Sequence, residues 1–320
     1  MKFVERNIID FKKTIKNIFD LMTIEGKYKV IGSSNLKNVL YNSDYDLAEF
    51  DEFKSLKSGQ EYIYHRFKDI FKKAESNKNV FITDFKCGVD SDNEPLRWNK
   101  KDIEKGFKTL KNGKKQSFND SLIDKDNTIK IDIVSLIDGV FVEFSENLYF
   151  KFGEGKTAIT NYIPSDITKP KILASIKADF FDKLKDGKPF KALKRKFAYY
   201  KLLDTDKYKN LLNTLLNFFN SPVGIVAKAH ADLDTIILVM ESSDKVKIED
   251  VVNNIQNIKQ NLSYTPDLEN VSEKLNKICS LKTKQQIIKQ LNIFNTDLYK
   301  YITYKTEQEF EKEKYSKNKI

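Results

Sequence analysis

Two aspartates separated by a single residue, Asp44 and Asp46, constrain the fold and function of this 320-residue chain more than any other sequence feature. They open an apolar run that predicts a β-strand over 44–50. Because side chains alternate between the two faces of a strand, both carboxylates should project from the same face. Two carboxylates this close repel each other unless a cation lies between them, and Mg²⁺ is commonly held by one or two carboxylates together with substrate phosphates. The pair therefore predicts a divalent-metal site for phosphate chemistry.

A glycine and a serine precede this pair at the end of another short apolar run. Residues 28–31 predict a strand, Gly32 and Ser33 follow it, and ten residues separate Ser33 from Asp44. Glycine lets a phosphate approach the backbone amides, and the serine hydroxyl adds a donor, so we expect these two residues to bind nucleotide phosphates. Other Asp-x-Asp pairs lack this context, because they fall in polar loops, at a helix start or inside a helix. They are Asp90/Asp92, Asp124/Asp126, Asp204/Asp206 and Asp232/Asp234.

The spacing of apolar residues divides the chain into two halves of different character. In the first half we predict strands over 28–31, 44–50, 80–89, 128–137 and 140–152, with helices over 3–22 and 58–74. A tight turn at Asp138-Gly139 should join the last two strands into a hairpin. Residues 100–126 show no sustained period, which predicts a surface excursion with one short helix. Beyond Pro164, helical spacing recurs over 170–184, 189–203, 208–219, 223–240, 248–261, 268–279 and 283–304. The expected fold class is α+β: a mixed β-sheet domain with flanking helices over 1–163, then an all-helical domain over 164–320 that ends in a charged, frayed tail from Glu307.

The amino-acid composition limits the kinds of binding partner and the cellular compartment that we expect for this protein. The chain carries 56 Lys and Arg against 46 Asp and Glu, a net charge of +10 that favours a polyanionic partner. The alternative explanation of this net charge is a general compositional bias toward Lys and Asn, which requires no binding partner. Two distant cysteines indicate neither a disulfide framework nor a zinc site. The charged N-terminus does not resemble a signal peptide, and no apolar run reaches the roughly 18 residues of a membrane span, so we expect a soluble cytoplasmic protein with no membrane partner.

The motif residues resemble a known family. Gly32-Ser33, the spacer and Asp44-Tyr45-Asp46 look like the signature of the DNA polymerase β-type nucleotidyltransferase superfamily, which includes poly(A) polymerases. The resemblance implies a nucleotidyltransferase-type sheet that binds two Mg²⁺ or Mn²⁺ ions and a nucleoside triphosphate, with ATP the expected substrate.

The same resemblance implies a third carboxylate on a later strand of the sheet. Asp132 matches best, because it lies between isoleucines as a half-buried strand position would, and Asp84 and Glu143 are the alternatives. Asp44, Asp46 and Asp132 are then the expected catalytic and metal-binding residues. Segments around Asp84, Asp132 and Glu143 are also similar to nucleotidyltransferase-like proteins of large DNA viruses, which suggests that the protein is virus-encoded.

Several cations are candidates for phosphate contacts. Lys86 should share a strand face with Asp84, and Arg97 follows in the next predicted extended segment. Family members often close cations of the helical domain on the triphosphate, which makes Lys191, Lys194 and Arg195 the candidates there. An ordinary solvated basic surface is the alternative interpretation for all five.

The expected function is therefore template-independent nucleotidyl transfer from a nucleoside triphosphate to an RNA 3′ end by a two-metal mechanism, as a poly(A) polymerase performs in mRNA processing. Two alternatives stay open. One is nucleotidyl transfer to a protein or a small molecule. The other is a catalytically inactive relative that serves as a binding subunit. The sequence leaves the oligomeric state open.

Overall fold

The computed structural model describes residues 5–7, 18, 20, 28–31, 38–40, 45–89, 95–110, 112–121, 128–152, 183, 221–263, 265, 268 and 270–317. The chain divides into two compact units. The sheet unit comprises Glu5–Ile167 together with Ser242–Lys245, and the helical unit comprises Met1–Val4, Thr168–Glu241 and Val246–Ile320. The predicted α+β class is confirmed. The boundary proposed between residues 163 and 164 falls outside the described residues and stays a prediction.

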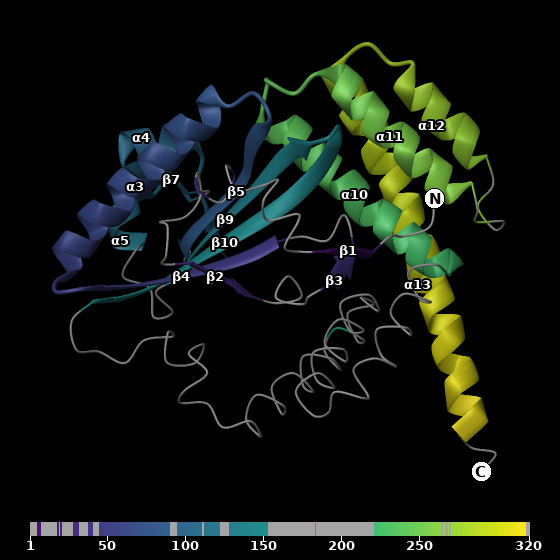
Figure 1. The fold of residues 1–320 in the computed structure, drawn as a ribbon, viewed down its shortest axis with the longest axis horizontal. Coiled ribbons are helices and arrows are strands. Elements are labelled where there is room, and N and C mark those ends of the chain that lie inside the picture. The colour runs from purple at the N-terminus through teal and green to yellow at the C-terminus, as the bar shows by residue number, and fades with distance from the viewer. Residues whose placement is uncertain are drawn as a thin grey trace. The chain divides into compact units, whose positions relative to one another are not determined.

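A mixed six-stranded sheet forms the core of the sheet unit (Figure 1). Its strand order is β2 (Tyr28–Ile31), β4 (Tyr45–Phe53), β10 (Val140–Phe152), β9 (Thr128–Ile137), β5 (Val80–Val89) and β6 (Pro95–Arg97). β10 runs parallel to β4, whereas the other neighbouring strands are antiparallel. The predicted Asp138-Gly139 turn joins β9 to β10, and both residues have a positive φ, as a tight hairpin turn requires.

Helix α3 (Leu56–Ser76) covers one face of this sheet. It begins at Ser55, whose side chain accepts a hydrogen bond from the Ser58 amide, and it confirms the helix predicted over 58–74. Its buried residues recur at helical spacing over Ile63, Phe67, Ile70 and Ala74. The ring of Phe67 lies 4.8 Å from that of Phe85 on β5. The sheet residues that share the face of Phe85 are also buried, among them Leu47, Ile131 and Phe144.

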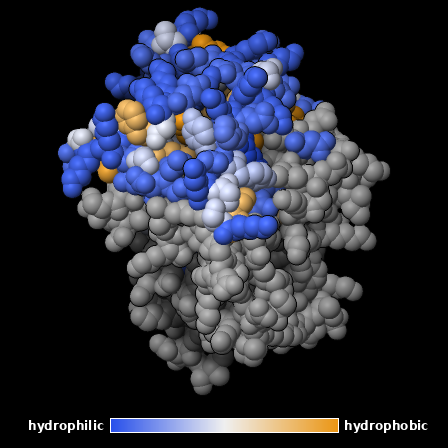
Figure 2. Space-filling model, turned by 90° about the vertical axis from the view of Figure 1, so that its left-hand side faces the viewer, coloured by the Kyte–Doolittle hydropathy of each residue, from blue (hydrophilic) through white to orange (hydrophobic). Residues whose placement is uncertain are grey.

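The predicted excursion over 100–126 contains more regular structure than its sequence pattern indicated. Helix α4 (Lys100–Lys105) leads into a hairpin of β7 (Phe107–Thr109) and β8 (Lys115–Ser117), and helix α5 (Phe118–Ser121) follows. Strands of three residues are too short to show a period, which is why the pattern missed them. Figure 2 shows the side of the molecule on which α3, α4, α5 and β7 lie in Figure 1, and its described surface is mainly hydrophilic.

The N-terminal prediction is wrong at its start. Glu5–Asn7 form strand β1, which pairs with β3 (Asn38–Leu40) in a separate two-stranded sheet, instead of beginning a helix over 3–22. Strand pairing with a distant segment overrides the helical spacing of this stretch.

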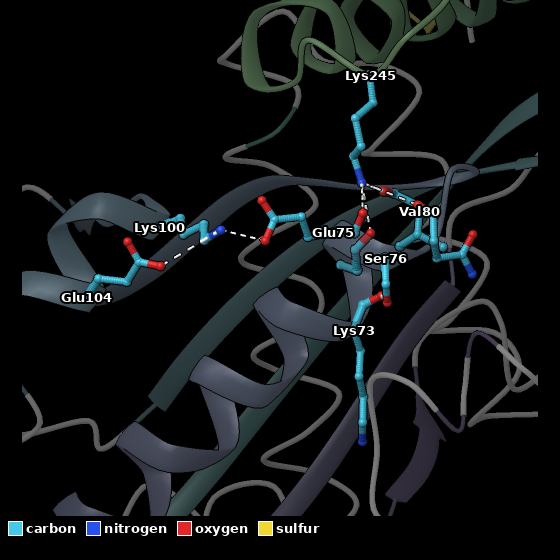
Figure 3. Close-up of polar contacts among 9 residues, drawn as sticks. Lys73, Glu75, Ser76, Val80, Lys100, Glu104 and Lys245 are labelled. Carbon is cyan, nitrogen blue, oxygen red and sulfur yellow. Dashed lines mark hydrogen bonds and ion pairs between the residues drawn. The ribbon is translucent and has the colours of Figure 1, made fainter.

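Lys245 caps the C-terminal end of α3 (Figure 3). Its ammonium group lies 2.8 Å from the carbonyl oxygen of Ala74, and 3.2 Å from those of Asn77 and Val80. The last carbonyls of a helix lack partners within the helix, so a cation in this position satisfies them. Burial lowers the pKa of Lys245, although the nearby Glu75 carboxylate opposes the shift.

The described part of the helical unit consists of α10 (Pro222–Ser242), α11 (Ile248–Leu262), α12 (Val271–Cys279) and α13 (Lys284–Lys317). These confirm the last four predicted helices, although the tail expected to fray from Glu307 is helical as far as Lys317. Asn295 on α13 joins α10 through hydrogen bonds with His230 and Asp234. The helices predicted over 170–184, 189–203 and 208–219 lie outside the described part of the chain, except for residue 183. In the described residues, no helix has the length and apolar character needed to cross a membrane.

Candidate active site

Four polar residues lie in line across the sheet, one on each of four neighbouring strands. Asp46 on β4 pairs with Ser145 on β10, Ser145 pairs with Asp132 on β9, and Asp132 pairs with Asp84 on β5. Directly paired residues project from the same face of a sheet, and this face is opposite to the one that α3 covers. We call these four residues the carboxylate row. Neighbouring strands lie about 4.8 Å apart, so the Cα atoms of Asp46 and Asp132 are about 10 Å apart.

A β-bulge brings Asp84 to this face. The pairing of β5 with β9 shifts between Ile82, which pairs with Ile133, and Asp84, which pairs with Asp132. Thr83 is the extra residue, and its hydroxyl donates a hydrogen bond of 3.1 Å to the carbonyl oxygen of Asp132. Regular pairing would have turned Asp84 toward α3, because a shift of one residue moves every following side chain to the other face.

Asp132 is the most enclosed carboxylate of the row, with 7% of its surface exposed. The Ser145 hydroxyl donates a hydrogen bond to its Oδ1 atom. The Nζ atom of Lys130 lies 3.2 Å from Oδ1, and the Nζ atom of Lys86 lies 3.7 Å from Oδ2. A buried carboxylate needs compensating donors and positive charge, and these three side chains supply both.

The neighbouring carboxylate of Asp84 is held by two further ion pairs. Lys86 Nζ lies 2.7 Å, and Arg97 Nη1 2.9 Å, from its Oδ2 atom. The pairing of Lys86 with Arg97 across β5 and β6 explains why both cations reach the same carboxylate. The sequence-based expectation that Lys86 shares a face with Asp84 is thus met, and both candidate cations contact the row.

The ammonium group of Lys130 interacts electrostatically with several carboxylates on this face of the sheet. Burial lowers the pKa of its ammonium group, but the Asp132 carboxylate, with smaller contributions from Asp46 and Glu143, more than offsets this and holds the pKa above its ordinary value. Asp46 and Glu143 therefore act on the same cation as Asp132. Neither Lys130 nor Ser145 was predicted. The alternation of β9 could have indicated Lys130, which lies two residues before Asp132, whereas Ser145 depends on the strand register.

The structure brings together some of the predicted site residues and does not describe the others. Asp46 and Asp132 lie in the row, as does Asp84, the alternative third carboxylate. Glu143 lies on the same face of β10, two residues before Ser145. β2 ends at Ile31, which pairs with Asp46. The remaining candidates, Asp44, Gly32, Ser33, Lys191, Lys194 and Arg195, lie outside the described residues.

The donor set suits a hard divalent cation. Carboxylate oxygens are the ligands that Mg²⁺ and Mn²⁺ prefer, and the row provides them on a face that already attracts the cationic side chains of Lys86 and Lys130. Within the described ranges, no three or more His, Cys, Asp or Glu side chains are grouped closely enough to hold a metal ion. Asp44, which directly precedes β4, is not among the described residues.

Neither a protein-family model nor a curated protein matches the sequence. Solved structures do match the fold. The M. chilensis Mg662 protein complexed with GTP has a TM-score of 0.69 and 13% identity, over 98% of this chain and 94% of that one. A structure described as a new nucleotidyl transferase encoded by a Megaviridae ORFan gene has a TM-score of 0.67 and 14% identity, over 95% of this chain and 90% of that one. A further structure of that description has a TM-score of 0.64 and 15% identity, over 98% and 95% of the two chains. This chain therefore shares the overall fold of these solved structures.

Proposed function

We propose that this protein is a metal-dependent, template-independent nucleotidyltransferase that adds nucleotides to an RNA 3′ end. Poly(A) addition from ATP is the form of the activity that we favour. The observation that carries the proposal is the carboxylate row, because it places Asp46, Asp132 and Asp84 on one face of a nucleotidyltransferase-fold sheet. The likeness to Megaviridae structures also supports a viral origin, and we extend the proposal to mRNA processing in the cytoplasm.

Asp44, Asp46 and Asp132 would hold the divalent ions in this proposal. When bound, two such ions lower the pKa of an attacking hydroxyl and stabilise charge during an in-line displacement at phosphorus. Ser145 lies between Asp46 and Asp132 and fixes the Asp132 carboxylate through its hydroxyl. That hydrogen bond holds Asp132 in one orientation before any substrate arrives, which is the preorganisation that catalysis requires.

The cations around the row would bind the triphosphate. Arg97 is 62% exposed at its side chain, and Lys130 is 40% exposed, so both can turn toward a phosphate while remaining near the carboxylates. Gly32 and Ser33 would contribute backbone amides and a hydroxyl from the end of β2. Lys191, Lys194 and Arg195 would approach from the helical domain. GTP in the Mg662 structure supports a nucleoside triphosphate as the substrate class.

Nucleotide incorporation into labelled RNA tests the proposal. The protein is incubated with a 5′-labelled RNA, each nucleoside triphosphate singly, and Mg²⁺ or Mn²⁺. Asp46→Asn and Asp132→Asn serve as variants of the row, and Asp69→Asn, an exposed position on α3, serves as the matched control. We expect extension by the wild type and the control, and none by the row variants or in the presence of EDTA. No incorporation by the wild type under any of these conditions would contradict the proposal.

The ion pairs of the row favour a second candidate, a catalytically inactive binding subunit. Lys86 and Lys130 already neutralise Asp132, as cations do in a carboxylate site that has lost its metals. Calorimetric binding of a nucleoside triphosphate that does not depend on Mg²⁺, without turnover, would select this candidate. Transfer to a protein or small molecule would instead appear as radiolabel on a protein band or a small product when labelled triphosphate is supplied without RNA.

A further inference from the structure

A cluster of positive charge begins next to the carboxylate row. The segment from Arg97 to Ser117 contains eight basic and two acidic residues, a net charge of +6 in 21 residues. Residues 183–201 form a second basic stretch, with eight basic residues and one acidic residue, but apart from residue 183 they lie outside the described residues. We call the segment from Arg97 to Ser117, which runs from the last residue of β6 through α4 and the β7–β8 hairpin, the basic segment. A general Lys and Asn bias does not explain such clustering, because it would spread the charge along the chain.

The basic segment is joined to the row by direct contacts. Arg97 Nη1 lies 2.9 Å from Asp84 Oδ2, at the end of the row. The ammonium group of Lys108 on β7 donates to the carbonyl oxygen of Arg97, which fixes the hairpin beside the β6 edge of the sheet. The basic segment therefore adjoins the row at the β6 edge of the sheet.

Most of these cations face solvent. Lys101, Lys105, Lys114 and Lys115 are exposed, and they lie on α4 and at the tip and second strand of the hairpin. The Nζ atom of Lys115 lies 4.6 Å from the ring centroid of Phe107, which holds the lysine over the hairpin. Lys100 differs from them because it pairs with Glu75 and Glu104. The four exposed lysines are therefore the side chains available to a ligand.

The composition of the surface distinguishes between polyanions. A peripheral membrane site combines cations with apolar side chains that insert into the lipid. The large exposed apolar side chains of the described residues are Leu238, Ile293, Tyr299 and Tyr304, and none of them belongs to the basic segment. A flexible single-stranded nucleic acid, by contrast, can bind to a row of cationic side chains, because contacts to its phosphates supply most of the affinity for the protein.

We propose that the basic segment binds the single-stranded nucleic acid whose 3′ end is extended at the carboxylate row. This inference rests on the proposed function for the identity of the site, and it adds the path of the acceptor: the strand leaves the row past Arg97 and crosses α4 and the hairpin. The contacts are to phosphates, so binding is independent of base sequence and falls steeply with salt.

Fluorescence anisotropy with a labelled single-stranded RNA, measured over a range of KCl concentrations, tests this inference. The test variant is Lys101→Gln/Lys105→Gln/Lys114→Gln/Lys115→Gln. The control variant is Lys57→Gln/Lys68→Gln/Lys72→Gln/Lys73→Gln, which removes the same charge from exposed positions of α3, outside the basic segment. Each phosphate contact on a single strand contributes about 0.7 to the slope of log K against log salt. We therefore expect the test variant to lose about 3 from this slope and to bind RNA at least about tenfold more weakly near 0.1 M salt. The control should match the wild type.

The outcomes separate this inference from the proposed function. Equal RNA affinity and slope in the wild type and both variants would overturn the inference, whatever the transfer activity. A wild type that binds RNA through the lysines but transfers no nucleotide to any acceptor would contradict the proposed function alone. Binding to anionic phosphatidylserine vesicles without binding to RNA would also overturn the inference. Circular dichroism and thermal unfolding of the variants establish that each is folded.

Discussion

The two faces of the six-stranded sheet both carry buried carboxylates paired with cations, but they use them differently. On the face covered by α3, Glu49 pairs with Arg66 at 2.6 Å, and the exposed fractions of the two side chains are 0% and 9%. On the other face the Asp132 side chain is 10% exposed, and its partners Lys130 and Lys86 are 40% and 26% exposed. The covered pair therefore has both charges removed from water, whereas in the pairs of Asp132 only the carboxylate is largely enclosed.

This difference in exposure separates a structural ion pair from an exchangeable one. Removing one partner of a fully buried pair leaves an uncompensated charge and costs about 3–5 kcal/mol, whereas pairs with an exposed partner contribute about 1 kcal/mol or less. The cations of the row can therefore leave their carboxylates at little cost when another cation takes their place. Glu49 and Arg66 cannot separate without loss of folding free energy.

The largest expected effect is on activity, from substitutions in the row. Asp132→Asn should lower the rate of nucleotide incorporation about a thousandfold or more, because it removes a carboxylate that would hold a divalent ion at the reacting phosphate. The asparagine keeps the size of the side chain and an acceptor for Ser145, so the melting temperature should change by only a few degrees. Initial rates and thermal unfolding measure the two quantities. A variant that is inactive only because it is unfolded would contradict the assignment of Asp132 to the site.

For the Glu49–Arg66 pair beneath α3 we expect a loss of stability without a loss of activity. Arg66→Met leaves the Glu49 carboxylate buried without its cation and should lower the free energy of unfolding by about 3 kcal/mol, with no change in the rate per folded molecule. Denaturant titration and initial rates at a temperature where the variant is folded check this. The double variant Glu49→Leu/Arg66→Met is the control, since replacing both charges with apolar groups should recover most of the loss.

A smaller effect is expected from a cation of the row. Lys130→Gln should raise the KM for the nucleoside triphosphate about tenfold with little change in kcat, because a phosphate-binding charge is lost while the carboxylates remain. Lys73→Gln, whose partner Asp69 is an exposed residue on the same turn of α3, provides the matched control and should change neither constant. An unchanged KM in Lys130→Gln would show that this lysine serves only to neutralise Asp132.

The smallest effect should come from the end of the covering helix. Lys245→Met removes the donor to the last carbonyls of α3 and should cost about 1 kcal/mol of unfolding free energy. Burial lowers the pKa of Lys245, so between its folded and ordinary pKa values the unfolded chain binds more protons than the folded one. The stability of the wild type relative to Lys245→Met should therefore increase as the pH rises through this window, below about 10.5. Denaturant titrations of both proteins between pH 7 and about pH 10.5 measure the difference, and a difference that falls with pH would contradict it.

Local pattern was sufficient to predict much of the sheet and the identity of Asp46 and Asp132 as strand residues. Alternation with period two predicted β4, β5, β9 and β10, and the Asp138-Gly139 turn predicted the hairpin. The place of Asp84 could not be predicted, because it depends on the bulge at Thr83, and a bulge leaves no mark in the alternation. The positions of Ser145 and of the Glu49–Arg66 pair depend on which strands and helices pack together. The spacing of residues along one sequence does not contain that information.

The parallel pairing of β10 with β4 also determines the order in which the contacts of the carboxylate row can form during folding. Asp46 and its neighbour Ser145 are 99 residues apart in sequence, whereas Ser145 and Asp132 are joined through a two-residue turn. Contacts between distant segments form late, because closing a long loop costs chain entropy, so the β9–β10 hairpin should precede its docking on β4. During synthesis, a chain that has not yet emerged past β10 can carry Asp46 but cannot assemble the row. The row can therefore form only after β4, β9 and β10 have all been made.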